Sequence, residues 1–179
     1  MLTVLLGGAR SGKSTAALRL ASRADGRVCF IATSPRIEGD HDLDARIAAH
    51  RDERPAEWRT IEAEVDIPAA LRDAGDALVV LDCLTVWVGN LLPLGHADER
   101  VLAASAEALR IASARTANTT VVTNEVGMGI IPADAMTRRY RDLLGRVNQQ
   151  WVAASDQAHL LIAGRALPLA DIADLGAEP

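Results

Sequence analysis

The sequence predicts an α/β domain built on a mostly parallel sheet. Short, unbroken apolar runs alternate along the chain with segments of helical periodicity, and such runs are typical of strands buried on both faces. A length of 179 residues, with 49% hydrophobic and 24% charged residues, suits one globular domain with its own core. The chain contains no internal repeat and no linker that would divide it, so we expect residues 1–179 to form a single domain.

Each expected strand is a short apolar run that ends close to a glycine or a polar residue, as buried strands do. In chain order, these runs occupy residues 2–6, 28–32, 77–81, 119–123 and 159–163, with a shorter sixth candidate at 167–169. The expected helices carry apolar residues three or four positions apart. They occupy residues 14–22, 43–51, 84–92, 101–115 and 136–151. The second helix should end near Arg54, because Pro55 disfavours helical geometry in the residue before it.

The composition excludes several classes of protein. A net charge of −5 argues against a broad nucleic-acid-binding surface. Cys29 and Cys83 lie in apolar runs without metal-site spacing, and we interpret them as buried free thiols of a reducing compartment. The amino-terminal residues lack a signal-peptide pattern, and no apolar stretch is long enough to span a bilayer. We therefore expect a cytoplasmic protein that has neither nucleic acid nor a membrane as a partner.

Residues 7–14, GGARSGKS, match the phosphate-binding pattern G-x-x-x-x-G-K-[ST] between an expected strand and an expected helix. In this pattern backbone N–H groups surround the phosphates, the lysine reaches the terminal phosphates, and the serine hydroxyl binds Mg²⁺. The chain has eighteen arginines but one lysine, Lys13, and a compact ammonium acts as a point charge at this position. The motif predicts a P-loop NTPase fold of the three-layer, RecA-like type. The predicted nucleotide-binding residues of the loop are Gly7, Gly8, Ala9, Arg10, Ser11, Gly12, Lys13 and Ser14.

Asp82 ends the third apolar run, at the position where P-loop proteins hold a carboxylate near Mg²⁺. An aspartate there can also simply cap the helix that follows it. Given the P-loop, we assign Ser14 and Asp82 to a Mg²⁺ site and expect a nucleoside triphosphate as ligand. These residues do not distinguish a kinase from an ATPase, a switch or a transferase.

A second informative segment surrounds His50. If this segment is helical, Arg46, His50 and Arg54 share one face. A neutral imidazole between guanidinium groups can attack a phosphoryl centre while the arginines hold its oxygens. A single histidine at the end of an amphipathic helix is also common as a surface or packing residue. The spacing alone leaves both interpretations open.

Five segments in this order resemble one family. They are GGARSGKS at 7–14, the pattern RIxxHxxxRPxxWxTxE at 46–62, VVLDCLTVWVGNLL at 79–92, VVTNEVGMGIIP at 121–132 and RRYRDLLGRVNQ at 138–149. The set is similar to the bifunctional adenosylcobinamide kinase / adenosylcobinamide-phosphate guanylyltransferase family of cobalamin biosynthesis. The resemblance extends over nearly the whole chain, to about Leu169.

The resemblance implies that the chain phosphorylates adenosylcobinamide with ATP or GTP and transfers GMP from GTP to adenosylcobinamide phosphate through a guanylylated His50. The product would be adenosylcobinamide-GDP. The resemblance also implies Mg²⁺ as cofactor and a homotrimer, and it leaves the kinase donor, ATP or GTP, undecided. Glu62 could accept hydrogen bonds from the paired N–H donors of guanine. The further nucleotide contacts implied by the resemblance are Ala32, Thr33, Ser34, Arg51, Asp52, Glu53, Arg54, Glu62 and Asp82.

The sequence leaves two interpretations open at several positions. Glu125 is a candidate for activating the substrate hydroxyl, or else a loop-stabilising carboxylate. Trp87, Trp151 and Met136 could contact the corrinoid, but their place in apolar helices favours packing. Two alternatives to the bifunctional enzyme also stay open: a guanylyltransferase without the kinase activity, and a non-catalytic P-loop switch or ATPase.

Overall fold

The computed structural model describes residues 1–35, 39, 45, 47, 48 and 51–174. At the centre of this part of the chain is a seven-stranded sheet with the strand order β3-β2-β4-β5-β1-β6-β7. Neighbouring strands are parallel except for β6 and β7, which confirms the mostly parallel sheet. The strands are β1 (Leu2–Gly7), β2 (Val28–Ala32), β3 (Arg59–Glu62), β4 (Leu78–Asp82), β5 (Thr119–Val122), β6 (Gln157–Ile162) and β7 (Arg165–Pro168).

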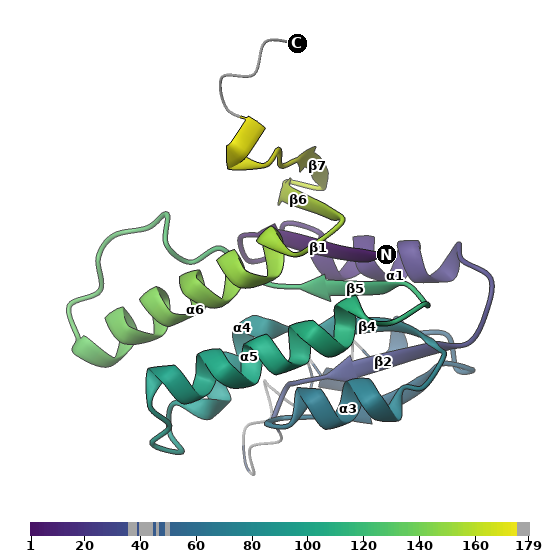
Figure 1. Cartoon of the computed structure of the whole chain (residues 1–179), viewed down its shortest axis with the longest axis horizontal. Helices are drawn as coiled ribbons and strands as arrows, with labels where there is room; N and C mark the ends of the chain where they lie inside the picture. Colours follow the sequence, from purple (N-terminus) through teal and green to yellow (C-terminus); the bar gives the residue numbers. More distant parts are fainter. Residues whose placement is uncertain (36–38, 40–44, 46, 49–50, 175–179) are drawn as a thin grey trace.

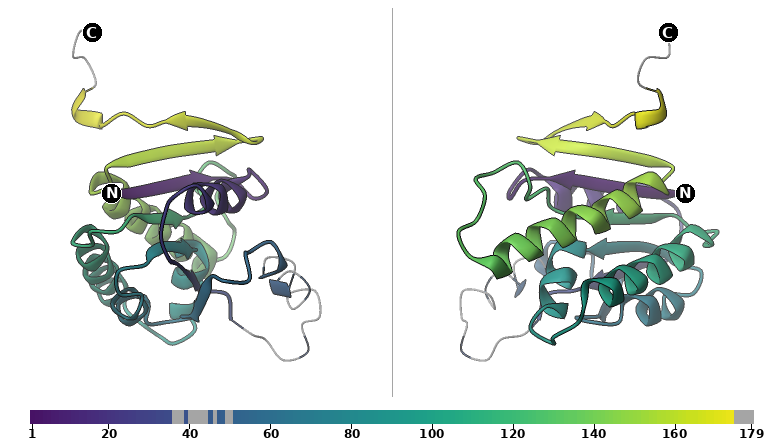
Figure 2. Two further views of the ribbon diagram at one scale, coloured as in Figure 1. Left: turned by 90° about the vertical axis from the view of Figure 1, so that its right-hand side faces the viewer. Right: turned by 60° about the vertical axis from the view of Figure 1, so that its left-hand side comes forward.

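Helices cover both faces of the sheet and produce the predicted three layers. α1 (Lys13–Ser22) lies against one face, over β1, β4 and β5. On the opposite face α5 packs against α3 and α6, and α4 packs against α6 (Figures 1 and 2). These helices are α3 (Ile67–Asp73), α4 (Leu84–Leu91), α5 (Asp98–Ser113) and α6 (Ala135–Ala153), and the 3-10 turn η1 (Ile172–Asp174) follows β7. No helix in the described ranges is both long and apolar enough to cross a bilayer.

The core consists of two apolar clusters, one on each face of the sheet. Alternate residues of β1 belong to different clusters, as the pleat of a strand requires. Val4 and Leu6 face the helices α3 to α6, whereas Leu5 faces α1 and shares its cluster with Ala17 and Ala21 of that helix. The unbroken apolar run therefore reflects burial on both sides.

Trp87 and Trp151 are fully buried in the larger cluster. Their indole N–H groups donate to Val65 O (2.6 Å) and Ser105 Oγ (3.1 Å), respectively. The packing interpretation is thus confirmed for both tryptophans. Met136 differs, because 62% of its surface is exposed at the start of α6.

Two elements were not expected from the sequence. β3 is a four-residue strand at the edge of the sheet, and its side chains are exposed or half-buried, so it lacks the apolar run of a buried strand. α3 has seven residues, with Asp66 as N-cap and Pro68 in its first turn, and is too short to show a helical period. The six expected strands are present, with ends that shift by at most two residues. The helix expected at 43–51 falls mostly outside the described residues.

Parallel pairing brings the carboxyl ends of the central strands to one edge of the sheet. One row of residues in register crosses four adjacent strands at this edge: Glu62, Ala32, Asp82 and Val122. Gly7 ends β1 in the same direction. Because α/β sheets bind ligands outside the carboxyl ends of their strands, this edge is where a site is expected.

Thr33 ties β2 to β4 just beyond this row. Its side chain is fully buried, and its hydroxyl donates to Cys83 O and accepts from Cys83 N, both at 2.8 Å. Its backbone N–H donates to Asp82 O (3.1 Å), and its carbonyl accepts from Asn90 Nδ2 (2.8 Å). Thr33 thus fixes the backbone that carries Asp82.

Replacing Thr33 by valine should destabilise the protein by about 2–3 kcal/mol, because a side chain of the same shape leaves Cys83 N without an acceptor and removes one of two donors to Cys83 O, the other being Trp87 N. Thr33→Ser keeps the hydroxyl and loses one methyl group, which costs about 1 kcal/mol. Urea unfolding followed by circular dichroism measures both free energies. Equal stability of the two variants would contradict the role given to the hydroxyl.

Candidate active site

The P-loop connects β1 to α1 through two glycines whose backbone conformations a side chain would strain. Gly7 has a φ of 149°, and a Cβ there would lie 2.3 Å from Leu161 O. Gly12, with a φ of 98°, is the N-cap of α1. The turn between β6 and β7 supports the loop, since Gly164 N donates to Ser11 O (2.9 Å). The loop thereby lies at a helix N-terminus, which favours anions.

Lys13 is buried in the first turn of α1, with 6% of its surface exposed. Its ammonium donates to Gly8 O (2.6 Å) and Ser11 Oγ (3.3 Å), so it lies over the loop. Burial lowers the pKa of Lys13, whereas the charge of the neighbouring Asp82 acts in the opposite direction. The ammonium is therefore a partly desolvated charge that an incoming phosphate would stabilise.

A cavity of about 410 Å³ opens between the P-loop and the carboxyl edge of the sheet. Its volume is within the usual range for a site that holds one small ligand. Ten of the predicted residues line it, and they come from five separate segments of the chain. These residues are Ala9, Arg10, Lys13, Ser14, Ala32, Ser34, Arg51, Arg54, Glu62 and Asp82.

Other predicted residues do not form the wall of this cavity. Four of them belong to the P-loop: Gly7, Gly8, Ser11 and Gly12. The Thr33 side chain faces the core, where its hydroxyl is hydrogen-bonded to the backbone of Cys83. Asp52 and Glu53 are exposed outside the cavity wall. His50 lies outside the described residues.

Two residues that the sequence analysis did not single out hold Arg54 against the cavity wall. Its guanidinium lies 3.6 Å from the centre of the Phe30 ring, and its Nη1 donates to Thr60 Oγ1 (3.4 Å). Burial lowers the pKa of Arg54, while Asp82 opposes that shift. The stacked guanidinium is a rigid cation that faces the nucleotide space. Strand alternation could have pointed to Phe30, since it shares a face of β2 with Ala32.

The segment that follows β5 contributes Asn124 to the same cavity. Its N–H donates to Thr85 Oγ1 (2.6 Å), and its carbonyl accepts from Asn148 Nδ2 (3.0 Å). Glu125 does not line the cavity, and its Oε1 accepts from Gly127 N (2.6 Å). This contact favours the loop-stabilising interpretation of Glu125.

Ser14 and Asp82 border the same space, and hydroxyl and carboxylate oxygens are donors that suit Mg²⁺. Within the described ranges no group of three or more His, Cys, Asp or Glu side chains could hold a metal ion. Ser14 and Asp82 therefore suit a cation such as Mg²⁺, which takes few protein ligands and completes its coordination shell with water and phosphate oxygens. Burial and the charge of Asp82 raise the pKa of the adjacent Cys83 to about 12, which keeps this thiol neutral.

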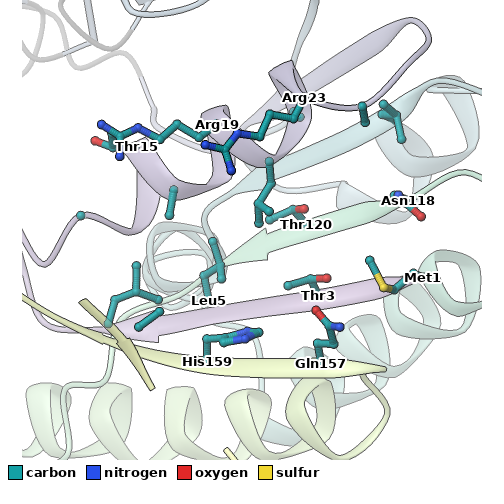
Figure 3. Close-up of a pocket in the computed structure, with 18 of the residues that line it drawn as sticks. Met1, Thr3, Leu5, Thr15, Arg19, Arg23, Asn118, Thr120, Gln157 and His159 are labelled. Atoms are coloured by element: carbon teal, nitrogen blue, oxygen red, sulfur yellow. The ribbon is translucent and has the colours of Figure 1, made fainter. Parts of the chain in front are cut away.

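A larger cavity, of about 590 Å³, lies on the α1 face of the sheet (Figure 3). Arg19 of α1 and Arg23, which follows the end of α1, border it, and Thr3 and His159 line its floor on β1 and β6. Of the predicted site residues in the described ranges, Gly12 alone touches it. Volume by itself does not identify the functional site, because the phosphate motif opens into the smaller cavity.

Comparison with known proteins agrees with this geometry. A family model, CobU, described as cobinamide kinase / cobinamide phosphate guanyltransferase, matches residues 3–169. The bifunctional adenosylcobalamin biosynthesis protein CobP of Pseudomonas aeruginosa is 37% identical over 171 residues, covering 94% of this chain and 97% of that protein. The bifunctional adenosylcobalamin biosynthesis protein CobU of Salmonella typhimurium is 40% identical over 178 residues, covering 92% of this chain and 97% of that protein.

Among solved structures, an ATPase from the type III secretion system of pathogenic bacteria superposes with a TM-score of 0.52 at 14% identity. The match covers 89% of this chain and 50% of that one, and it confirms the predicted P-loop fold. The family match extends over residues 3–169, and the bacterial relatives align along almost their whole length. The chain therefore belongs to the cobinamide kinase / cobinamide phosphate guanyltransferase family of bifunctional enzymes.

Proposed function

We propose that this chain phosphorylates adenosylcobinamide with ATP or GTP and then transfers GMP from GTP to adenosylcobinamide phosphate, giving adenosylcobinamide-GDP. The observation that carries the proposal is the 410 Å³ cavity. Lys13, Ser14 and Asp82 border it on the phosphate side, and Arg54 and Glu62 border it farther along the sheet edge. A nucleotide bound there would have its triphosphate at the P-loop and its base toward β3.

In the kinase step, a hydroxyl oxygen of the acceptor attacks the γ-phosphorus and loses its proton. The bond from that phosphorus to the β–γ bridging oxygen breaks, and a nucleoside diphosphate leaves. Lys13 and the N-terminus of α1 hold the terminal phosphates and offset the charge that develops on the leaving group. Ser14 and Asp82 would hold Mg²⁺, which neutralises phosphate charge when it is bound.

In the transferase step, we assign His50 as the nucleophile on the basis of the family resemblance. A ring nitrogen of His50 attacks the α-phosphorus of GTP, the bond to the α–β bridging oxygen breaks, and pyrophosphate leaves. A phosphate oxygen of adenosylcobinamide phosphate then attacks the histidine-bound phosphorus, and cleavage of the N–P bond frees His50. Ile47 and Arg51, which flank His50 in the sequence, both line the cavity, and this supports a nucleophile that acts on a nucleotide there.

We assign Glu62 to recognition of the base. A carboxylate can accept hydrogen bonds from N1–H and from the exocyclic amino group of guanine, a donor pair that adenine lacks. β3 lies four strand positions from β1, roughly 19 Å at about 4.8 Å per strand. An extended nucleotide can therefore have its base near Glu62 while its phosphates lie at the P-loop.

The other expectations from the resemblance belong to the same proposal. Nucleotide contacts would come from the turn at residues 32–34 and from residues 51–54, and residues 1–179 would act as one domain. A homotrimer and a cytoplasmic location are also implied. Light scattering and cell fractionation test these two expectations.

Incubation of the wild-type chain with GTP should add one guanylyl group, detected as intact mass, through a bond that is labile in acid and stable in base, as a phosphoramidate is. His50→Ala should add none. His96→Ala, which replaces a histidine in the connection between α4 and α5, should behave like the wild type. Undiminished addition to His50→Ala would contradict the assigned nucleophile. Formation of the phosphate ester from ATP and adenosylcobinamide tests the kinase activity separately.

Lys13→Arg should lower the rate of both reactions by about 10²–10³-fold, because a planar fork replaces a compact cation in the P-loop.

The pH dependence of nucleotide binding gives a second measurement of the role of Lys13. Because burial lowers the pKa of Lys13, nucleotide affinity should be constant near neutral pH and fall as pH rises through that lowered pKa, which lies below the ordinary value of a lysine side chain. The arginine variant keeps its charge and should lose this alkaline decrease. Calorimetric titration across pH measures it, and an unchanged profile would contradict the role of the ammonium.

Glu62→Ala should remove the preference for guanine. In the wild type, guanylylation by GTP should exceed the matching reaction with ITP by roughly 10–100-fold, because inosine lacks the exocyclic amino group. The ratio should approach one in the variant. Glu64→Ala, at an exposed position outside the cavity, is the matched control. A GTP preference that survives in Glu62→Ala would exclude this carboxylate from base recognition.

A further inference from the structure

Four large apolar side chains are exposed on the segment that connects β5 to the first turn of α6. Met128, Ile130 and Ile131 are 80%, 97% and 68% exposed, and Met136 is 62% exposed. These four residues lie close together in the sequence, and exposed apolar patches mark sites of interaction on proteins. We call these four residues the apolar loop surface.

Both ends of this loop are anchored, so the exposure of its side chains is built into the fold. At the start, Glu125 N donates to Gly7 O (3.2 Å), and Glu125 Oε1 accepts from Gly127 N (2.6 Å). At the end, Nη1 of Arg138 donates to Pro132 O (2.9 Å). The apolar side chains project from a backbone that is held on both sides.

The loop leaves the sheet at the rim of the nucleotide cavity. Asn124, which lines the cavity, comes one residue before the Glu125 anchor, and Gly7 begins the P-loop. Figure 1 shows the connection between β5 and α6 extending beyond the carboxyl edge of the sheet, where the P-loop also lies. A molecule bound to this loop would lie beside the phosphates.

We infer that the apolar loop surface binds the corrin ring of the acceptor outside the nucleotide cavity, an inference that rests on the proposed function. The cavity has room for one small ligand, and cationic and anionic side chains line it, so a macrocycle and a nucleotide cannot share it. A corrin ring presents broad apolar faces bordered by amides. Methionine and isoleucine side chains match such faces, and methionine adapts readily to their shape.

A second copy of this chain is the competing occupant. Covering four side chains of this size removes roughly 250–500 Å² of apolar surface from water. Each partner in a standard protein–protein interface contributes about 800 Å². The apolar loop surface is therefore too small to hold two protein chains together by itself, whereas it suits one macrocycle.

The test is the equilibrium binding of adenosylcobinamide to the full chain, measured by calorimetry with and without nucleotide. In the double variant Met128→Ser/Ile130→Ser the dissociation constant should rise at least about tenfold. Addition of GMP from GTP alone, and molar mass by light scattering, should not change. Ile172→Ser is the matched control, because Ile172 is also 80% exposed but lies beyond β7, and adenosylcobinamide binding should be unaffected in it.

Three results overturn the inference: adenosylcobinamide binding by the double variant that equals the wild type, no binding by the wild type, or a fall in molar mass, which would identify a second copy as the occupant. Because binding is measured without turnover, the inference and the proposed function can be contradicted independently of each other. A wild-type chain that binds adenosylcobinamide through this loop but forms neither the phosphate ester nor the guanylyl adduct would contradict the proposed function and leave the inference standing.

Discussion

The nucleotide site depends on one buried positive charge. Burial disfavours the ammonium of Lys13, and its hydrogen bonds to Gly8 and Ser11 together with the charge of Asp82 compensate in part. These partners come from the loop after β1 and from the end of β4, so the cation is stable there when β1, α1 and β4 are packed together. Since it has already lost much of its hydration, the ammonium gains most from an anion that replaces the missing water. In a chain with eighteen arginines, this is where the one lysine is found.

The same register that packs the core also assembles the site. Ile31 and Leu81 are fully buried against the helices on one face, and the next residue of each strand, Ala32 and Asp82, lines the cavity. A shift of one residue in a strand would move its apolar side chains out of the core and its site residue out of the row that also contains Glu62. Core packing therefore fixes the relative positions of the residues at the carboxyl edge. The hydrogen bonds of Thr33 to Cys83 hold the same edge from the core side.

The parts of the site that are encoded by neighbouring residues in the sequence could be predicted from the sequence. The P-loop is a run of eight residues, and Asp82 ends an apolar strand, so both were expected, and both Lys13 and Asp82 line one cavity. β3 could not be predicted, because an edge strand with exposed side chains shows no apolar run, although its register places Glu62 in the row. The stacking of Arg54 on Phe30 joins residues that are distant in the chain. It depends on how the segment after β2 returns to the sheet, which no local pattern encodes.

The size of the cavity limits how two reactions can share one chain. A volume of about 410 Å³ is typical of a site for one small ligand, so we expect the nucleotide of the kinase step and the GTP of the transferase step to bind there one at a time. If both reactions use this cavity, they must be sequential, and the nucleotide product of the first must leave before GTP binds for the second. The acceptor need not leave, because the apolar loop surface lies outside the cavity. Asn124 borders the cavity two residues after β5 and immediately before the anchored loop, so the segment after this strand would connect the proposed nucleotide site to the proposed acceptor surface.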